Sequence, residues 1–203
     1  AIKSGVPYKG RIVLRGDGAK VTLRLSWGEG QSVAHKISTT KKWKTHHFTL
    51  NPNVDTTDAR FEIVASGKGN FSVGAVSLMP GDNIKGFRAD TLALMKEMNC
   101  QILRMPGGNF ISAHDWEDSI GDPDKRPPIL DPVWSAVQPN DVGVDELIQF
   151  CELIECEPFW CVNTGFGDPR SGAQLLEYVN GSADTEWGAK RAANGAACAG
   201  LRF

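Results

Sequence analysis

The sequence predicts an antiparallel β-sandwich domain followed by an α/β segment with a parallel sheet. In the first eighty residues, short runs of alternating apolar and polar residues recur about every ten positions, separated by turn-forming residues. From Gly86 onward, helix-length segments alternate with short apolar strands. Two of these strands run directly into polar loops. We therefore expect a domain at 1–80, a linker at 81–85 and an α/β domain at 86–203.

The alternation is clearest in the second run, where Val21, Leu23 and Leu25 share one face. Gly16, Asp17 and Gly18 predict a hairpin turn between the first two strands. The six expected strands are Lys9 to Arg15, Lys20 to Trp27, Gln31 to Ile37, Lys44 to Leu50, Arg60 to Ala65 and Phe71 to Leu78.

The second domain begins with a predicted helix that Asp90 caps. The expected helices run from Asp90 to about Asn99, Asp145 to about Cys156, Ser171 to Val179 and Thr185 to Ala193. The expected strands are Gln101 to Arg104, Pro158 to Val162, and a third that starts at Leu201.

The segment from Gln101 to Asp118 is the strongest candidate for a functional site. After the strand, Pro106 and two glycines turn the chain, and Asn109, His114, Asp115 and Trp116 follow within eight residues. A second polar loop, Asn163 to Asp168, follows the next strand. Loops after parallel strands open on the same side, so we expect Asn109 and Asn163 to converge on one ligand.

Composition narrows the class of protein. Hydrophobic residues make up 41% and charged residues 23%, which is ordinary for a globular chain. A net charge of -2 argues against a nucleic-acid partner, and no apolar stretch is long enough for a membrane span. The spacing of the five cysteines fits no zinc site. We therefore predict no metal and no cofactor, and interpret the cysteines as mostly buried thiols.

Trp27 and Trp43 in the first domain are candidates for stacking against a glycan, because an exposed indole offers a flat apolar surface to a sugar ring. The alternative is that each fills the core or shields a sheet edge. The sequence does not decide between these two interpretations.

Several motifs in order resemble the α-L-arabinofuranosidases of glycoside hydrolase family 51. They are Arg-Met-Pro-Gly-Gly-Asn-Phe from Arg104, His-Asp-Trp-Glu-Asp-Ser-Ile-Gly-Asp from His114, Asp-Lys-Arg-Pro-Pro from Asp124, Val-Asn-Thr-Gly from Val162, Tyr-Val-Asn-Gly from Tyr178 and Ala-Ala-Asn-Gly from Ala192. The resemblance covers about three-fifths of the chain, and the first domain resembles a carbohydrate-binding module.

The resemblance implies a (β/α)8 TIM barrel and retaining hydrolysis of terminal arabinofuranosyl residues from arabinan or arabinoxylan. It implies that Asn109 hydrogen-bonds the arabinose, that Arg104 holds the carboxylate network and that Trp116 lies near the pocket wall, with Asn163 second in rank. On the residues alone, we favour the interpretation that Arg104 is an ion-paired strand residue, Asn109 a turn former and Trp116 a core residue.

One departure from the family pattern is important. Retaining hydrolysis needs two carboxylates, and the family's acid/base follows an Asn, but the chain contains no Asn-Glu pair. We therefore expect an incomplete barrel that lacks both catalytic carboxylates. We interpret Asp115, Glu117 and Asp118 as solvated or paired with Arg126, and Glu157, which precedes its strand, as non-catalytic.

Two or three strands cannot close a barrel, so their uncovered edges predict that the chain associates into a homo-oligomer, repacks, or belongs to a longer polypeptide. Two other functions stay open. One is a non-catalytic carbohydrate-binding protein, and the other is an oligomeric hydrolase of cellulose or xylan. The cellular compartment is left open.

Overall fold

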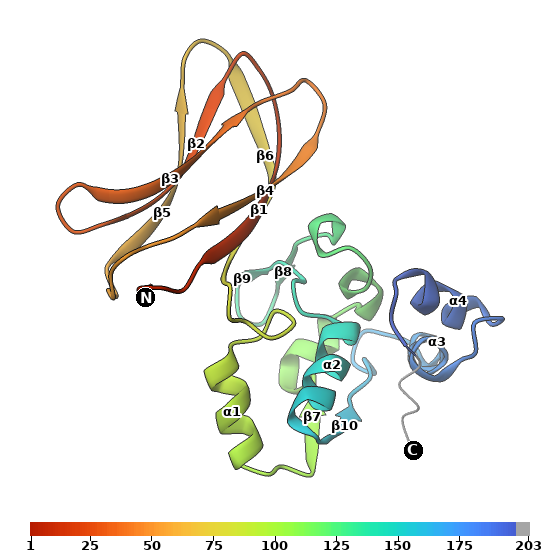
Figure 1. Ribbon diagram of the computed structural model, residues 1–203. Coiled ribbons are helices and arrows are strands. Elements are labelled where there is room, and N and C mark those ends of the chain that lie inside the picture. The colour runs from red at the N-terminus through yellow and green to blue at the C-terminus, as the bar shows by residue number, and fades with distance from the viewer. Residues whose placement is uncertain (198–203) are drawn as a thin grey trace. The chain divides into compact units, whose positions relative to one another are not determined.

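A computed structural model describes residues 1–197 of the chain. The chain divides into two compact units, Ala1–Ala89 and a second that begins at Asp90. The strand expected from Leu201 lies outside the described residues. Each unit is described by itself below (Figure 1).

The first unit contains six strands, close to the six that the alternation predicts. They are β1 (Tyr8–Asp17), β2 (Lys20–Trp27), β3 (Gln31–Ser38), β4 (Lys44–Leu50), β5 (Ala59–Ser66) and β6 (Asn70–Pro80). They pair antiparallel in two three-stranded sheets, ordered β4-β1-β6 and β3-β2-β5. The inward residues of both sheets form one hydrophobic cluster, which includes Ile12, Leu14, Phe48 and the predicted set Val21, Leu23 and Leu25.

The predicted hairpin at Gly16 to Gly18 is wrong. β1 pairs with β4 and β6, whereas β2 pairs with β3 and β5, so the turn carries the chain from one sheet to the other. Gly18 has a φ of 72°, which a glycine adopts without steric cost. Alternation determines which face of a strand is buried, but it does not choose the partner strand.

The second unit follows the predicted order of helices and strands. Its helices are α1 (Ala89–Glu97), α2 (Val144–Ile154), α3 (Pro169–Asn180) and α4 (Glu186–Ala193), and its main strands are β7 (Ile102–Met105) and β10 (Glu157–Trp160). Two helices begin after a residue whose side chain caps the helix. Asp168 accepts from Ser171 N at the start of α3, and Thr185 accepts from Gly188 N at the start of α4.

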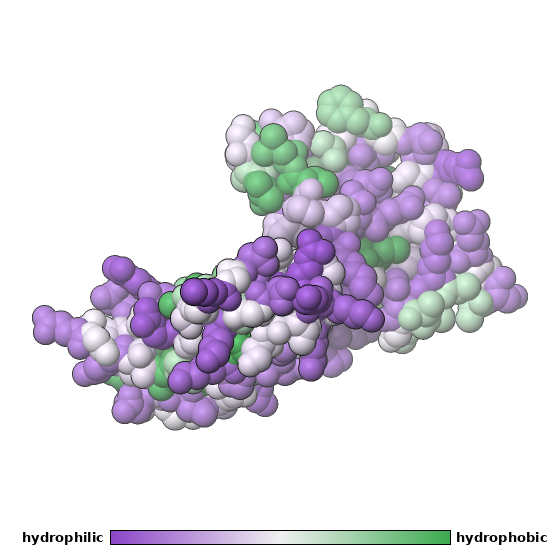
Figure 2. Space-filling view, turned by 90° about the horizontal axis from the view of Figure 1, so that it is seen from above, coloured by the Kyte–Doolittle hydropathy of each residue, from purple (hydrophilic) through white to green (hydrophobic). Residues whose placement is uncertain are grey.

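β7 and β10 pair in parallel, as predicted, with Arg104 opposite Phe159. Because side chains alternate along a strand, Ile102, Arg104 and Phe159 share one face of the pair. Ile102 is 64% exposed and Phe159 57% exposed, so this face is uncovered in the described chain. Hydrophobic patches at the surface, among mostly hydrophilic residues, are visible in Figure 2. The other face carries Trp160, which packs against the core of the unit.

Between the two main strands lies a segment that the sequence did not predict. It contains three 3-10 turns, η1 (Gly108–Ala113), η2 (Trp116–Ser119) and η3 (Pro123–Lys125), and a hairpin of β8 (Ile129–Asp131) and β9 (Ala136–Gln138). Of the two alternatives for Asp115, Glu117 and Asp118, the structure supports solvation for the exposed Asp115 and Glu117, and Arg126 pairs elsewhere. Arg126 is buried against Glu146, with Nη2 2.8 Å from Oε1 and Nη1 3.0 Å from Oε2.

Two further sequence expectations concern the burial of the cysteines and the absence of a membrane span. Of the four cysteines in the described part of the chain, only Cys151 is buried, so the expectation of mostly buried thiols is wrong for Cys100, Cys156 and Cys161. None of the helices among residues 1–197 is both long and apolar enough to span a membrane.

Candidate functional site

Arg104 lies near the carboxyl end of β7 with its side chain exposed. Its Nη1 donates to the Sγ of Cys161, 3.5 Å away and just beyond the end of β10. The guanidinium lies directly over Gly107, where an added Cβ would come within 2.6 Å of Nη1. Gly107 therefore leaves room for the arginine, whereas Gly108, with a φ of 63°, serves the turn itself.

Asn109 follows in η1, and its side chain is exposed. The turn is attached to the body of the unit by Phe110, whose ring stacks on His114 with 4.7 Å between centroids. The structure thus places Asn109 and Arg104 in the same short segment, on either side of the two glycines. Both side chains are accessible to a ligand.

Asn163 joins the two polar loops. Its Nδ2 donates to the backbone oxygen of His114 at 3.2 Å, and its Oδ1 accepts from the amides of Gly165, Phe166 and Gly167 at 3.1–3.2 Å. A further bond runs from Phe166 N to Ser112 O. The predicted side-by-side placement of the loops is therefore observed, but the amide of Asn163 is engaged in holding them together.

Trp116 lies beneath the loops in a buried cluster with Tyr178 and Trp187, at centroid distances of 5.4 and 4.9 Å. Its Nε1 donates to both the backbone oxygen and the Oγ of Ser171, each at 3.2 Å. These contacts connect the first polar loop to the start of α3.

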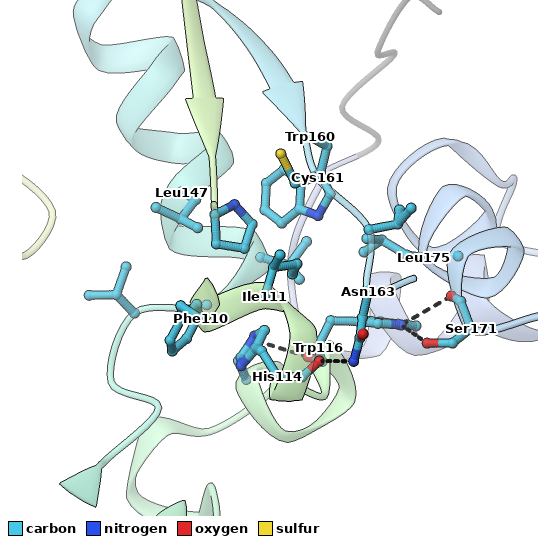
Figure 3. Close-up of a pocket in the computed structure, with 17 residues that line it drawn as sticks. Phe110, Ile111, His114, Trp116, Leu147, Trp160, Cys161, Asn163, Ser171 and Leu175 are labelled. Atoms are coloured by element: carbon cyan, nitrogen blue, oxygen red, sulfur yellow. Dashed lines mark hydrogen bonds between the residues drawn. The ribbon is translucent and has the colours of Figure 1, made fainter. Parts of the chain in front are cut away.

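A cavity of about 30 Å³ lies between these parts, lined mainly by apolar side chains (Figure 3). His114 lines it and is buried, and its Nδ1 has no hydrogen-bond partner. Burial lowers the pKa of His114, and the charges of Asp115 and Asp118 oppose this only in part. His114 is therefore a buried ring between the loops, in surroundings that disfavour its charged form.

A larger open cleft of about 570 Å³ lies beside it, between the two loops and α3. Asp115 and Glu117 line this cleft with exposed side chains, and Asp115 also accepts from Glu117 N. Partial burial and the charge of Asp115 raise the pKa of Glu117, and the same two causes raise that of Asp118. Glu157 is the first residue of β10, as predicted.

The two tryptophans of the first unit differ. Trp27 is buried in the core, and its Nε1 donates to Gln31 Oε1 at 2.7 Å. Trp43 is 48% exposed, with the guanidinium of Arg15 4.8 Å from its ring centroid. The ring of Trp43 also approaches Gly74, where a Cβ would be 3.3 Å away.

Sequence reasoning missed two partners in this region, Cys161 of Arg104 and Ser171 of Trp116. Strand alternation places Cys161 on the same face as Phe159 and Arg104, so pairing the two strands in register would have found it. Among residues 1–197, no cluster of three or more His, Cys, Asp or Glu side chains could hold a metal ion.

Residues 94–198 match the model of the alpha-L-arabinofuranosidase 1 domain family. The chain is 38% identical over 116 residues to a probable alpha-L-arabinofuranosidase C of Aspergillus clavatus, covering 57% of this chain and 23% of the relative. It is 42% identical over 95 residues to an intracellular exo-alpha-(1->5)-L-arabinofuranosidase of Acetivibrio thermocellus, covering 47% and 19%. The chain thus spans about a fifth to a quarter of the length of these relatives.

Solved structures show the same likeness. An arabinose complex of the Thermotoga maritima α-L-arabinofuranosidase has a TM-score of 0.53 at 40% identity, covering 55% of this chain and 23% of that one. An arabinose-bound family 51 α-L-arabinofuranosidase, MgGH51, has a TM-score of 0.79 at 24% identity and covers 96% of this chain and 37% of that one. At that identity the second match is evidence of a shared fold alone.

Proposed function

The chain belongs to the α-L-arabinofuranosidases of glycoside hydrolase family 51, and from this premise we propose that it forms one wall of the arabinose pocket of a retaining hydrolase. The substrate is a terminal α-L-arabinofuranosyl residue of arabinan or arabinoxylan. The proposed architecture is an antiparallel β-sandwich at 1–80, a linker at 81–85 and part of a (β/α)8 barrel at 86–203.

The main support for this proposal is the arrangement of Arg104, Asn109 and Asn163 at the carboxyl ends of two adjacent parallel strands. In (β/α)8 enzymes this end of the strands carries the active site. Exposed amide and guanidinium groups donate hydrogen bonds to sugar hydroxyls, so Asn109 binds the arabinose and Arg104 orients the carboxylates. Trp116 supports the loop from beneath, and Asn163 fixes its position.

The proposal also holds that the chain lacks both catalytic carboxylates. Retaining hydrolysis requires two carboxyl groups about 5–5.5 Å apart, one a nucleophile and the other an acid and then a base. Asp115 caps η2, and Glu117 is exposed in an open cleft. We therefore assign neither residue as nucleophile or acid/base, and infer that the two catalytic carboxylates come from another part of a longer polypeptide.

The test uses the longer polypeptide encoded with this chain and an aryl α-L-arabinofuranoside. Asn109→Ala should lower kcat/KM about 5- to 13-fold, because one hydrogen bond to the sugar contributes about 1–1.5 kcal/mol. Asn53→Ala, at an exposed position of the first unit, is the matched control. An unchanged kcat/KM in Asn109→Ala would refute the assignment.

Trp43 favours a second function, glycan binding by the first unit. Its exposed ring contacts Arg15 and lies close to Gly74. These two contacts hold the flat apolar surface of the indole in place. Affinity electrophoresis in arabinoxylan gels tests this directly. Retardation that is lost in Trp43→Ala supports binding, with Trp27→Phe as the buried control, and migration equal to that in a plain gel refutes it.

A further inference from the structure

The carboxyl end of α2 brings two cysteines together. α2 ends at Ile154, and the next residue, Glu155, has the left-handed conformation with a φ of 61° and a ψ of 44°. The amide of Cys156 donates to the backbone oxygen of Cys151 at 3.0 Å, and the amide of Glu155 donates to that of Glu152 at 3.4 Å. These two bonds define a Schellman cap, in which the residues at the two ends of the longer bond bring their side chains into contact.

Here both of these side chains are thiols, and the Cys156 thiol is near enough to contribute to the raised pKa of Cys151. Disulfides join residues whose Cα atoms lie about 4.4–6.8 Å apart. The backbone hydrogen bond between these same two residues keeps their main chains close. Bond formation therefore needs rotation of the side chains rather than movement of the helix.

We propose that Cys151 and Cys156 form a reversible disulfide that locks the C-terminal cap of α2. Cys156 is partly exposed and can meet an oxidant, whereas Cys151 is buried and can meet only Cys156. The cap leads directly into β10, at whose far end Asn163 lies. The bond thus fixes the start of the strand that carries the second polar loop.

The oxidant is a peroxide, and the reaction takes two steps. The thiolate of Cys156 attacks one oxygen of hydrogen peroxide, the O–O bond breaks, and the leaving hydroxide takes up a proton to give water. The sulfur of Cys151 then loses its proton and attacks the sulfenic acid on Cys156. The S–S bond forms, the S–O bond breaks, and a second water leaves. Two thiols and one peroxide give one disulfide and two waters.

The electrostatics set this order of attack. Burial, followed by the neighbouring Cys156 thiol, raises the pKa of Cys151 to about 12, so Cys151 stays protonated at neutral pH. The first attack therefore falls to Cys156. Cys161 takes no part, because its sulfur accepts from Arg104 beyond the other end of β10.

The test uses the purified 203-residue chain, reduced and then treated with hydrogen peroxide. After free thiols are blocked, endoproteinase Glu-C cuts after Glu152 and Glu155 and separates the two cysteines, so only a disulfide can hold fragments 147–152 and 156–157 together. We expect a loss of about 2 Da in the intact mass, this linked pair of fragments, and full reversal by dithiothreitol. Cys161→Ser should behave like the unsubstituted chain.

A linked pair that includes Cys100, a Cys156 oxidised to the sulfinic acid without any cross-link, or five thiols that survive treatment would each overturn the proposal. Because the fragment map is read on the unsubstituted chain, it does not depend on the folding of a variant. Cys151→Ser should abolish the cross-link and leave Cys156 as the sulfenic acid, which dimedone traps. The outcome is independent of the proposed sugar site.

Discussion

Replacing Arg126 with methionine removes one partner of a buried ion pair. The Arg126 side chain is 2% exposed, and its guanidinium donates to both oxygens of Glu146 and to the backbone oxygens of Gly121 and Asn140. Glu146 also accepts from Gly143 N at the start of α2. The arginine thus connects the unpredicted segment to the helix. Arg126→Met removes the guanidinium partner of the partly buried Glu146 carboxylate and the donor to three backbone oxygens, those of Gly121, Asn140 and Asp141.

Breaking a buried pair in this way costs about 3–5 kcal/mol. The neighbouring Lys125 offers a matched control, since its pair with Asp122 is exposed, with Lys125 82% and Asp122 50% accessible. Exposed pairs contribute about 0–1 kcal/mol. Lys125→Met should therefore be nearly neutral, although it removes the same kind of charge one residue away.

Hydrogen exchange followed by mass spectrometry measures the effect where it occurs. In Arg126→Met, peptides of α2 should exchange at least about 100-fold faster, the equivalent of about 3 kcal/mol, and peptides of β2 in the other unit should be unchanged. Equal exchange of the α2 peptides in Arg126→Met and Lys125→Met would contradict this reasoning. It would mean that the Arg126–Glu146 pair does not hold α2 to the segment of 3-10 turns.

Three further predictions concern the second unit. Burial lowers the pKa of His114, so below about pH 6.5 the unfolded chain binds a proton more readily than the folded chain does. The stability against urea should therefore fall as the pH drops below about 6.5, and His114→Gln should flatten this fall. Tyr178→Phe removes the donor to the partly buried Asp145 (2.8 Å) and should cost about 1–3 kcal/mol in urea titrations. Light scattering should find the chain self-associated, and Phe159→Ser should shift it toward the monomer.

Each of these has a contrary result. If urea stability falls as steeply with pH in His114→Gln as in the unsubstituted chain, the acid sensitivity does not come from this histidine. A stability loss in Tyr178→Phe below about 0.5 kcal/mol would mean that its hydroxyl contributes little to the core. A concentration-independent monomer would contradict the role assigned to the uncovered face of β7 and β10.

Much of the fold was predictable because it depends on local periodicity. Alternation placed Val21, Leu23 and Leu25 in the core, and helix-length stripes placed all four helices to within a few residues, although Asp90, the predicted cap, lies inside the first turn of α1. The partners of β1 and β2 were not predictable, because pairing depends on contacts between residues far apart in the sequence. The segment of 3-10 turns and the β8–β9 hairpin is held by Arg126, whose long-range bonds leave no periodic pattern.

The candidate site was predictable to a similar extent. The glycines after β7 and the polar residues after β10 indicated two converging loops, and Asn163 does join them. The sequence did not indicate that the Oδ1 of Asn163 accepts hydrogen bonds from its own loop, or that Trp116 donates to Ser171. Both contacts depend on side-chain directions in the folded chain. The contact between Cys151 and Cys156 depends on one left-handed residue, Glu155, which is not a glycine.

The most direct test of the central claim is the release of arabinose from an aryl α-L-arabinofuranoside by the purified 203-residue chain. A full-length family 51 enzyme, assayed at the same molar concentration, gives the reference rate. We predict no release above the uncatalysed rate, because in the proposed function the chain provides a wall of the sugar pocket but not the two carboxylates. Release at a rate comparable with that of the full-length enzyme would contradict this account.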